Sequence, residues 1–188
     1  MARWQPGTRG RLQEVSLELF RERGFDSVTV AEIAQRAEVT ERTFYRYFAD
    51  KREVLFDGQE RLREAFVAGV AACPADASPL DLAAGALDRA AEFFADDRRS
   101  WSRARQSVIE NDPALQEREL LKLAALSAAL AGALHERGVS DQRAGLTADL
   151  AVSVFRIAFA RWISPGEVQS MRELQRDVLD TLQALTSS

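Results

Sequence analysis

Residues 29–51 read TVAEIAQRAEVTERTFYRYFADK, and this stretch decides the fold of the first part of the chain. Thr29 is followed three positions later by Glu32, which is the capping-box pattern that begins a helix. Thr40 can cap a second short helix, after a turn of three or four residues that contains Glu38. Two short capped helices joined by such a turn are typical of a helix-turn-helix.

The second of these helices has two chemically different faces. Apolar residues of the stretch would form a small core: Ile33, Ala37, Val39, Phe44 and Phe48. The opposite face carries polar and aromatic side chains: Arg42, Thr43, Tyr45, Arg46 and Tyr47. A tyrosine hydroxyl can donate to a phosphate, and an arginine near the front of the helix can reach a guanine edge. The pattern therefore indicates a helix that enters the major groove of DNA.

Lys51 stands next to a predicted helix start at Asp50. A lysine in the first turn opposes the helix dipole, so stability alone does not explain its position. A DNA phosphate held there would explain it.

Outward from this stretch, the whole chain has the pattern of helices. A helix over residues 8–23 precedes it and ends at Gly24. Further helices are expected over about 50–70, 80–95, 96–111, 113–136, 140–163 and 166–185, and no segment alternates like a strand. The prediction is an all-α fold of about nine helices. A three-helix DNA-binding domain would cover residues 1–52, and a helical bundle would cover residues 53–188.

Composition and charge fit this division. The 188 residues are 46% hydrophobic and 29% charged, as in an ordinary folded protein. Residues 1–52 carry a net charge of +2 and the remainder −6, so the front is mildly basic within an acidic chain. No apolar run reaches the roughly 20 residues that span a bilayer, and the first residues lack the apolar stretch of a signal peptide. With Cys73 as the single cysteine, we expect a cytoplasmic protein.

Residues 11–56 resemble the TetR family of transcriptional regulators. The resemblance rests on an apolar first helix ending in Arg-Gly-Phe, on Thr29-Val-Ala-Glu-Ile-Ala, on Val39-Thr40, and on Thr43-Phe-Tyr-Arg-Tyr-Phe48 followed by Lys51. It implies that Thr29, Thr43, Tyr45, Tyr47 and Lys51 contact the DNA backbone. We add Thr40, Arg42 and Arg46 as candidate contacts. Glu38 and Arg42 stand where the family often has glycine, so Arg42 either reads a base or only fills space.

The same resemblance implies that the C-terminal helices enclose an apolar effector cavity. The candidate effector-binding residues are Phe66, Phe94, Trp101, Arg105, Leu123, Leu126, Phe155 and Phe159. For each apolar residue taken singly, ordinary core packing is the favoured explanation. Residues 105–116 are similar to regulators that bind acyl-CoA-like ligands, including mycofactocin-linked members. The arginines at 98, 99, 103 and 105 could meet an anionic ligand head, or form a solvated face balanced by nearby acidic residues.

The last two helices have apolar faces that need a partner. Candidate interface residues between two copies are Leu150, Val154, Ile157, Met171, Leu174, Val178 and Leu182. The chain's own bundle could also cover them. A dimer is favoured, because a single DNA-binding domain makes few contacts with DNA. Two such domains would match half-sites about 34–36 Å apart.

Enzymatic activity is not expected. The only histidine, His135, lies near a helix end, and Cys73 lies in a loop without a basic neighbour. Metal-ligand spacings, phosphate loops and nucleophile elbows are missing from the sequence, so no cofactor or metal is expected. The leading hypothesis is a repressor that leaves a near-palindromic DNA operator when a small, largely apolar molecule binds. The alternative is a helical DNA-binding or interaction protein without small-molecule sensing.

Overall fold

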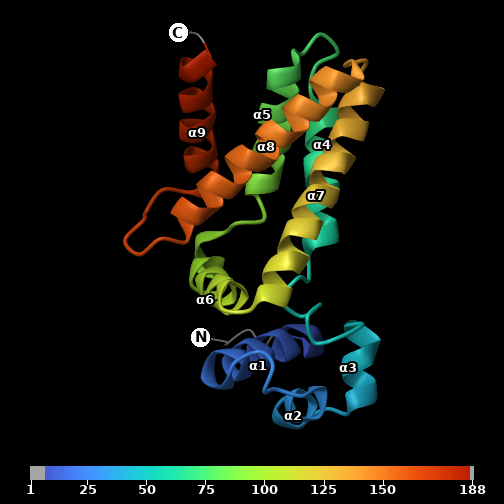
Figure 1. Cartoon of the computed structure of the whole chain (residues 1–188), viewed down its shortest axis with the longest axis vertical. Helices are drawn as coiled ribbons and strands as arrows, with labels where there is room; N and C mark the ends of the chain where they lie inside the picture. The colour runs from blue at the N-terminus through green and yellow to red at the C-terminus, as the bar shows by residue number, and fades with distance from the viewer. Residues whose placement is uncertain (1–6, 187–188) are drawn as a thin grey trace. The chain divides into compact units, whose positions relative to one another are not determined.

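The computed structural model describes residues 7–186, and side chains up to Leu185. The predicted lack of a signal peptide concerns the first residues of the chain, and the first six of these lie outside the described range. The helices are α1 Thr8–Arg23, α2 Val30–Arg36, α3 Glu41–Tyr47, α4 Gln59–Ala72, α5 Pro79–Ala91, α6 Arg99–Glu110, α7 Pro113–Glu136, α8 Asp141–Trp162 and α9 Met171–Thr186 (Figure 1). The predicted all-α fold is confirmed. None of the helices described is long and apolar enough to cross a membrane.

The largest difference from the predicted elements is the start of α4. It begins at Gln59 rather than at Asp50, and residues 51–58 form turns. The Asp50 carboxylate accepts hydrogen bonds from the backbone of Arg52 and Glu53, which fixes the first turn. Gly58 then adopts a φ of 86°, a conformation that side-chain-bearing residues disfavour. The helix can begin only after this residue.

The chain forms two compact units. One contains residues up to Asp57 together with Ala104–Glu119, and the other contains Gly58–Arg103 with the chain from Leu120 onward. The second half of α6 and the start of α7 therefore belong to the same unit as the helix-turn-helix. Sequence periodicity gave no sign of this, because α6 and α7 each contribute residues to both units.

The larger unit packs α4, α5, α7, α8 and α9 around one apolar core. Its aromatic centre joins Phe66, Phe94, Phe155, Phe159 and Trp162, whose ring centroids lie 5.5–6.1 Å apart. Helices α4 and α5 approach closely where two glycines meet. A Cβ atom added at Gly69 would lie 2.5 Å from the carbonyl oxygen of Gly85. The absence of a side chain at Gly69 therefore sets the distance between these helices.

Gly69→Ala is expected to destabilise the protein by about 2 kcal/mol, because the new methyl group meets backbone atoms that can move only if the helices separate. Denaturant unfolding followed by circular dichroism measures this loss. The control is Gly132→Ala in α7, where an added Cβ has no neighbour within 4 Å. That variant should gain up to about 1 kcal/mol from helix propensity. Equal shifts in the two variants would contradict the packing argument.

Candidate DNA-binding surface and effector site

Both helices of the helix-turn-helix begin at the predicted caps. The Thr29 hydroxyl accepts from the backbone N–H of Glu32, whose carboxylate in turn accepts from the backbone N–H of Thr29 at 2.8 Å. This bond from Thr29, together with the Arg23 guanidinium, lowers the pKa of Glu32 to about 2. Thr40 accepts from the backbone N–H of Thr43, and the two hydroxyls lie 3.0 Å apart. Helices of seven residues depend on such caps, since they are too short to be stable alone.

The turn between α2 and α3 carries a strained residue. Glu38 adopts a φ of 55°, the left-handed region that favours glycine. Its neighbour Val39 donates its N–H back to the carbonyl of Ala34 at 2.9 Å, which closes the turn. Glu38 therefore replaces the family's usual glycine at a position where the backbone requires a positive φ.

Helix α3 presents one continuous exposed face. Arg42, Tyr45 and Arg46 are all exposed, at the three- and four-residue spacing of one helix side. Tyr45 has 54% of its surface exposed, whereas Phe44 and Phe48 on the other side are buried. Tyr47 is half-buried, with the Arg46 guanidinium carbon 5.0 Å from its ring centroid. A hydrogen bond from Arg46 also lowers the pKa of the Tyr47 hydroxyl.

Lys51 requires a correction. It lies in a turn and not in a helical first turn, so the dipole argument for a phosphate does not apply. Its Nζ donates to the backbone carbonyls of Phe25 at 2.8 Å, Val28 at 3.0 Å and Asp26 at 3.4 Å. The same ammonium lies 4.3 Å from the Phe25 ring centroid. An ammonium has three N–H donors, so Lys51 is fully occupied in holding the turn between α1 and α2.

Arg105 also has a different role from the predicted one. Its side chain is buried inside the DNA-binding unit, where Nε donates to the Leu55 carbonyl at 2.5 Å. An ion pair of 3.2 Å joins it to Glu119, and the guanidinium lies over the Phe56 ring. Burial lowers the pKa of Arg105, and Glu119 opposes that effect. Arg105 is therefore committed to internal contacts and is not placed to hold an effector head.

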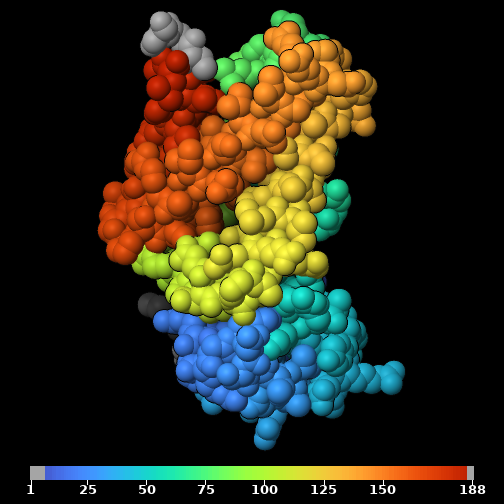
Figure 2. Space-filling view, in the orientation of Figure 1, coloured from blue at the N-terminus to red at the C-terminus, as the bar shows by residue number. Residues whose placement is uncertain are grey.

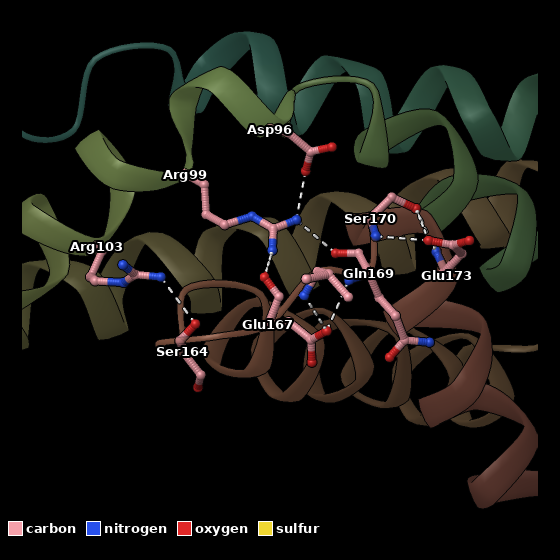
Figure 3. A network of polar contacts seen from close by, with 9 residues as sticks. Asp96, Arg99, Arg103, Ser164, Glu167, Gln169, Ser170 and Glu173 are labelled. Carbon is pink, nitrogen blue, oxygen red and sulfur yellow. Dashed lines mark hydrogen bonds and ion pairs between the residues drawn. The ribbon is translucent and has the colours of Figure 1, made fainter.

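Arg98, which precedes α6, differs from the two remaining arginines of that helix, Arg99 and Arg103 (Figure 3). Arg99 donates to the carbonyls of Glu167 and Gln169, and Arg103 donates to those of Ile163 and Ser164. These bonds tie the start of α6 to the loop between α8 and α9. Arg98, by contrast, is exposed, with its guanidinium 5.1 Å from the Trp101 ring centroid. Arg99 also pairs with Asp96 at 2.5 Å, one of the acidic residues expected to balance these arginines, and Arg103 is exposed, so both fit the expected basic face in part. Sequence spacing could not reveal partners 60 to 70 residues away.

The apolar effector candidates are largely brought together. Phe66, Phe94, Phe155 and Phe159 touch ring to ring, and Leu123 and Leu126 pack in the same core. Trp101 lies under Arg98 instead. Trp162, which the sequence argument did not select, joins the ring cluster against Phe94 and Phe159. Its indole N–H is buried and has no hydrogen-bond partner among the described residues.

The candidate interface residues fall into two groups. Leu150 and Ile157 on α8 are exposed, and Leu146, one turn before Leu150, is 60% exposed. Helix α8 runs uncovered across the visible face of its unit (Figure 2). Val178 and Leu182 are partly buried against the core of the same chain. Val154, Met171 and Leu174 are at most 3% exposed in the single chain, so they pack in the core of the protomer.

Comparisons with known proteins agree with this architecture. Residues 12–57 match the family described as bacterial regulatory proteins, tetR family, and residues 77–186 match the MftR C-terminal domain. The HTH-type transcriptional regulator TcmR of Streptomyces glaucescens is 41% identical over 80 residues, which are 43% of this chain and 35% of TcmR. The chain thus spans about a third of the length of that curated relative.

Solved structures share the fold along nearly the whole chain. A putative TetR-family regulator from Syntrophomonas wolfei has a TM-score of 0.64 at 16% identity, covering 96% of this chain and 95% of its own. The regulator FadR from Bacillus subtilis, in complex with stearoyl-CoA, has a TM-score of 0.61 at 17% identity, covering 92% and 96%. At these identities the likeness concerns the fold.

Proposed function

Because the chain belongs to the TetR family of bacterial regulatory proteins and has an MftR-type C-terminal domain, we propose that it is a dimeric repressor released from a near-palindromic DNA operator by an acyl-CoA-like effector. The observation that carries this proposal is the exposed face of α3. Arg42, Tyr45 and Arg46 stand free of the core on α3, a short helix capped by Thr40, and the preceding helix α2 is capped by Thr29.

In the proposed complex α3 lies in the major groove. Arg42 is nearest the start of the helix and reads a guanine edge, since an arginine can donate two hydrogen bonds to it. Tyr45, Arg46 and Tyr47 bind phosphates, as do the hydroxyls of Thr29, Thr40 and Thr43. Lys51 is left out of this set, because its three donors are directed at backbone carbonyls.

The effector site is proposed within the aromatic cluster of the larger unit. An acyl chain would lie among Phe66, Phe94, Phe155 and Phe159, which supply an apolar surface. The buried indole N–H of Trp162 would donate to a carbonyl oxygen of the effector and so gain the hydrogen bond that it lacks. The fold shared with the stearoyl-CoA complex of FadR supports this class of ligand.

The proposed dimer contact is the exposed apolar line on α8, formed by Leu146, Leu150 and Ile157. Side chains this large, exposed at intervals on one helix side, mark a contact surface. A second copy would cover them and place two α3 helices on successive half-sites. Contact between α8 helices does not require the residues of α9 that are buried within the protomer.

The test is selection of bound DNA from a random pool, followed by titration of the selected complex with stearoyl-CoA. The expected result is a near-palindromic site and release of DNA as stearoyl-CoA is added. Recovery of a specific site without release would support the alternative, a DNA-binding protein that does not sense this class of molecule. Failure to recover any preferred site would overturn the proposal.

Arg42→Ala is the sharpest variant of this test. If Arg42 reads a guanine, its loss should weaken operator binding by about 1–3 kcal/mol per contact and relax the preference at one base per half-site. Affinity for scrambled DNA should change little. Fluorescence anisotropy on operator, single-base variants and scrambled DNA measures all three quantities. A variant that keeps the full base preference would show that Arg42 contacts only phosphate or solvent.

A further inference from the structure

A groove between α5 and α9 is separate from the aromatic cluster. Its volume is about 300 Å3, at the lower end of the range for small-molecule sites. Ala84 of α5 and Leu179 of α9 give it apolar walls, and its polar groups are Asp88, Arg172, Gln175 and Arg176. The two helices contact each other and belong to the same unit.

Gln175 is the unusual residue of this groove. It is only 2% exposed, yet neither its amide oxygen nor its amide nitrogen has a hydrogen-bond partner among the described residues. A buried polar group without a partner is unfavourable by about 1–3 kcal/mol. Its neighbours Leu174 and Leu179 on α9 are buried apolar residues, so a leucine at position 175 would suit the folded chain better. A ligand that pairs with the amide would account for the glutamine.

The rim of the groove carries more positive than negative charge. Asp88 is shared by two arginines, at 2.6 Å from Arg172 and 3.2 Å from Arg176. Glu92 lies 3.9 Å from Arg172 and is itself paired with Arg89 at 2.5 Å. Three arginines thus share two carboxylates. Arg176, whose side chain is 66% exposed, forms an ion pair with the shared Asp88 and can turn to an arriving anion.

We propose that this groove binds a small molecule that carries an amide edge and a carboxylate. An amide presents one donor and one acceptor side by side, which matches both unpaired atoms of Gln175. The carboxylate would pair with the Arg176 guanidinium at the rim. The site is distinct from the proposed acyl-CoA site and does not depend on it.

The probe is 4-carbamoylbenzoate, with benzoate and benzamide as controls that each lack one of the two groups. Ligand-observed NMR titration of the full chain is expected to give at least tenfold tighter binding for 4-carbamoylbenzoate than for either control. Equal affinity for the three compounds would overturn the proposal, as would no binding of any of them.

Two variants locate the binding. Gln175→Leu should weaken the probe at least tenfold and should raise the melting temperature, because it removes an unpaired buried amide. Arg176→Ala should weaken the probe several-fold without changing the melting temperature. Gln183→Leu, at an exposed position of the same helix, is the control and should leave probe binding unchanged. Unchanged probe affinity in Gln175→Leu overturns the proposal. The proposal is also overturned if Gln175→Leu shifts the monomer–dimer equilibrium and leaves the affinity for the probe unchanged. The groove would then hold a second copy of the chain.

Discussion

Replacement of Arg105 by alanine is expected to lower the free energy of unfolding of the DNA-binding unit by about 3–5 kcal/mol. The reason is its burial. Removal of the guanidinium leaves the Leu55 carbonyl without its donor and takes the ion-pair partner from the half-buried Glu119 carboxylate, which keeps the amide of Gln106 at 3.4 Å. The residue lies inside the unit that contains the helix-turn-helix, so operator binding should fail as that unit loses structure. A role in holding an effector head would instead leave operator affinity intact.

The control for Arg105→Ala is Arg98→Ala, at the position directly before α6. Arg98 is exposed and contacts the Trp101 ring, so its removal should change stability by less than about 1 kcal/mol. Thermal unfolding and operator affinity, measured on both variants, separate the two roles. An Arg105→Ala protein that unfolds like the parent and binds operator like the parent would refute the structural assignment.

Lys51→Met should destabilise the same unit by about 2–4 kcal/mol, because three backbone carbonyls lose a charged donor at once. The slope of log affinity against log salt should not change in the fraction that remains folded. A phosphate contact would give the opposite pattern. Its loss from both heads of a dimer would reduce the slope by about two while stability stayed the same.

Arg46→Ala is the matched control for Lys51→Met. Arg46 is an exposed cation on α3, so its removal should leave the unfolding midpoint nearly unchanged and reduce the salt slope. Denaturant unfolding and DNA titrations across a salt series, at a temperature where both variants are folded, give the comparison. A Lys51→Met protein with a reduced slope and the parent's stability would restore the phosphate role.

The salt slope of operator binding therefore depends on cations that the core leaves free. In the helix-turn-helix these are the exposed arginines, Arg36 of α2 and Arg42 and Arg46 of α3, whereas Lys51 and Arg105 contribute to its stability. If a variant of Lys51 or Arg105 loses DNA binding, its free energy of unfolding should therefore be measured before the loss is attributed to a missing DNA contact. The distinction follows from which carbonyl and carboxylate groups each cation already pairs with.

Local residue patterns are enough to predict the all-helical fold and the two short helices of the DNA-binding unit. The caps at Thr29 and Thr40 act on residues only three positions away, so the spacing of residue types is enough to predict them. The exposed and buried sides of α3 follow for the same reason, since a helix places residues three and four positions apart on one face.

The roles of the other cations and of the last helices depend on long-range packing. Lys51 finds its carbonyls 23 to 26 residues away, Arg105 reaches Leu55 across 50 residues, and Arg99 reaches the α8–α9 loop across about 70. Likewise Leu150 and Leu174 have equally apolar side chains, yet the first is exposed and the second is buried. Such outcomes depend on which distant segments pack together, and the order of residues along one helix does not contain that information.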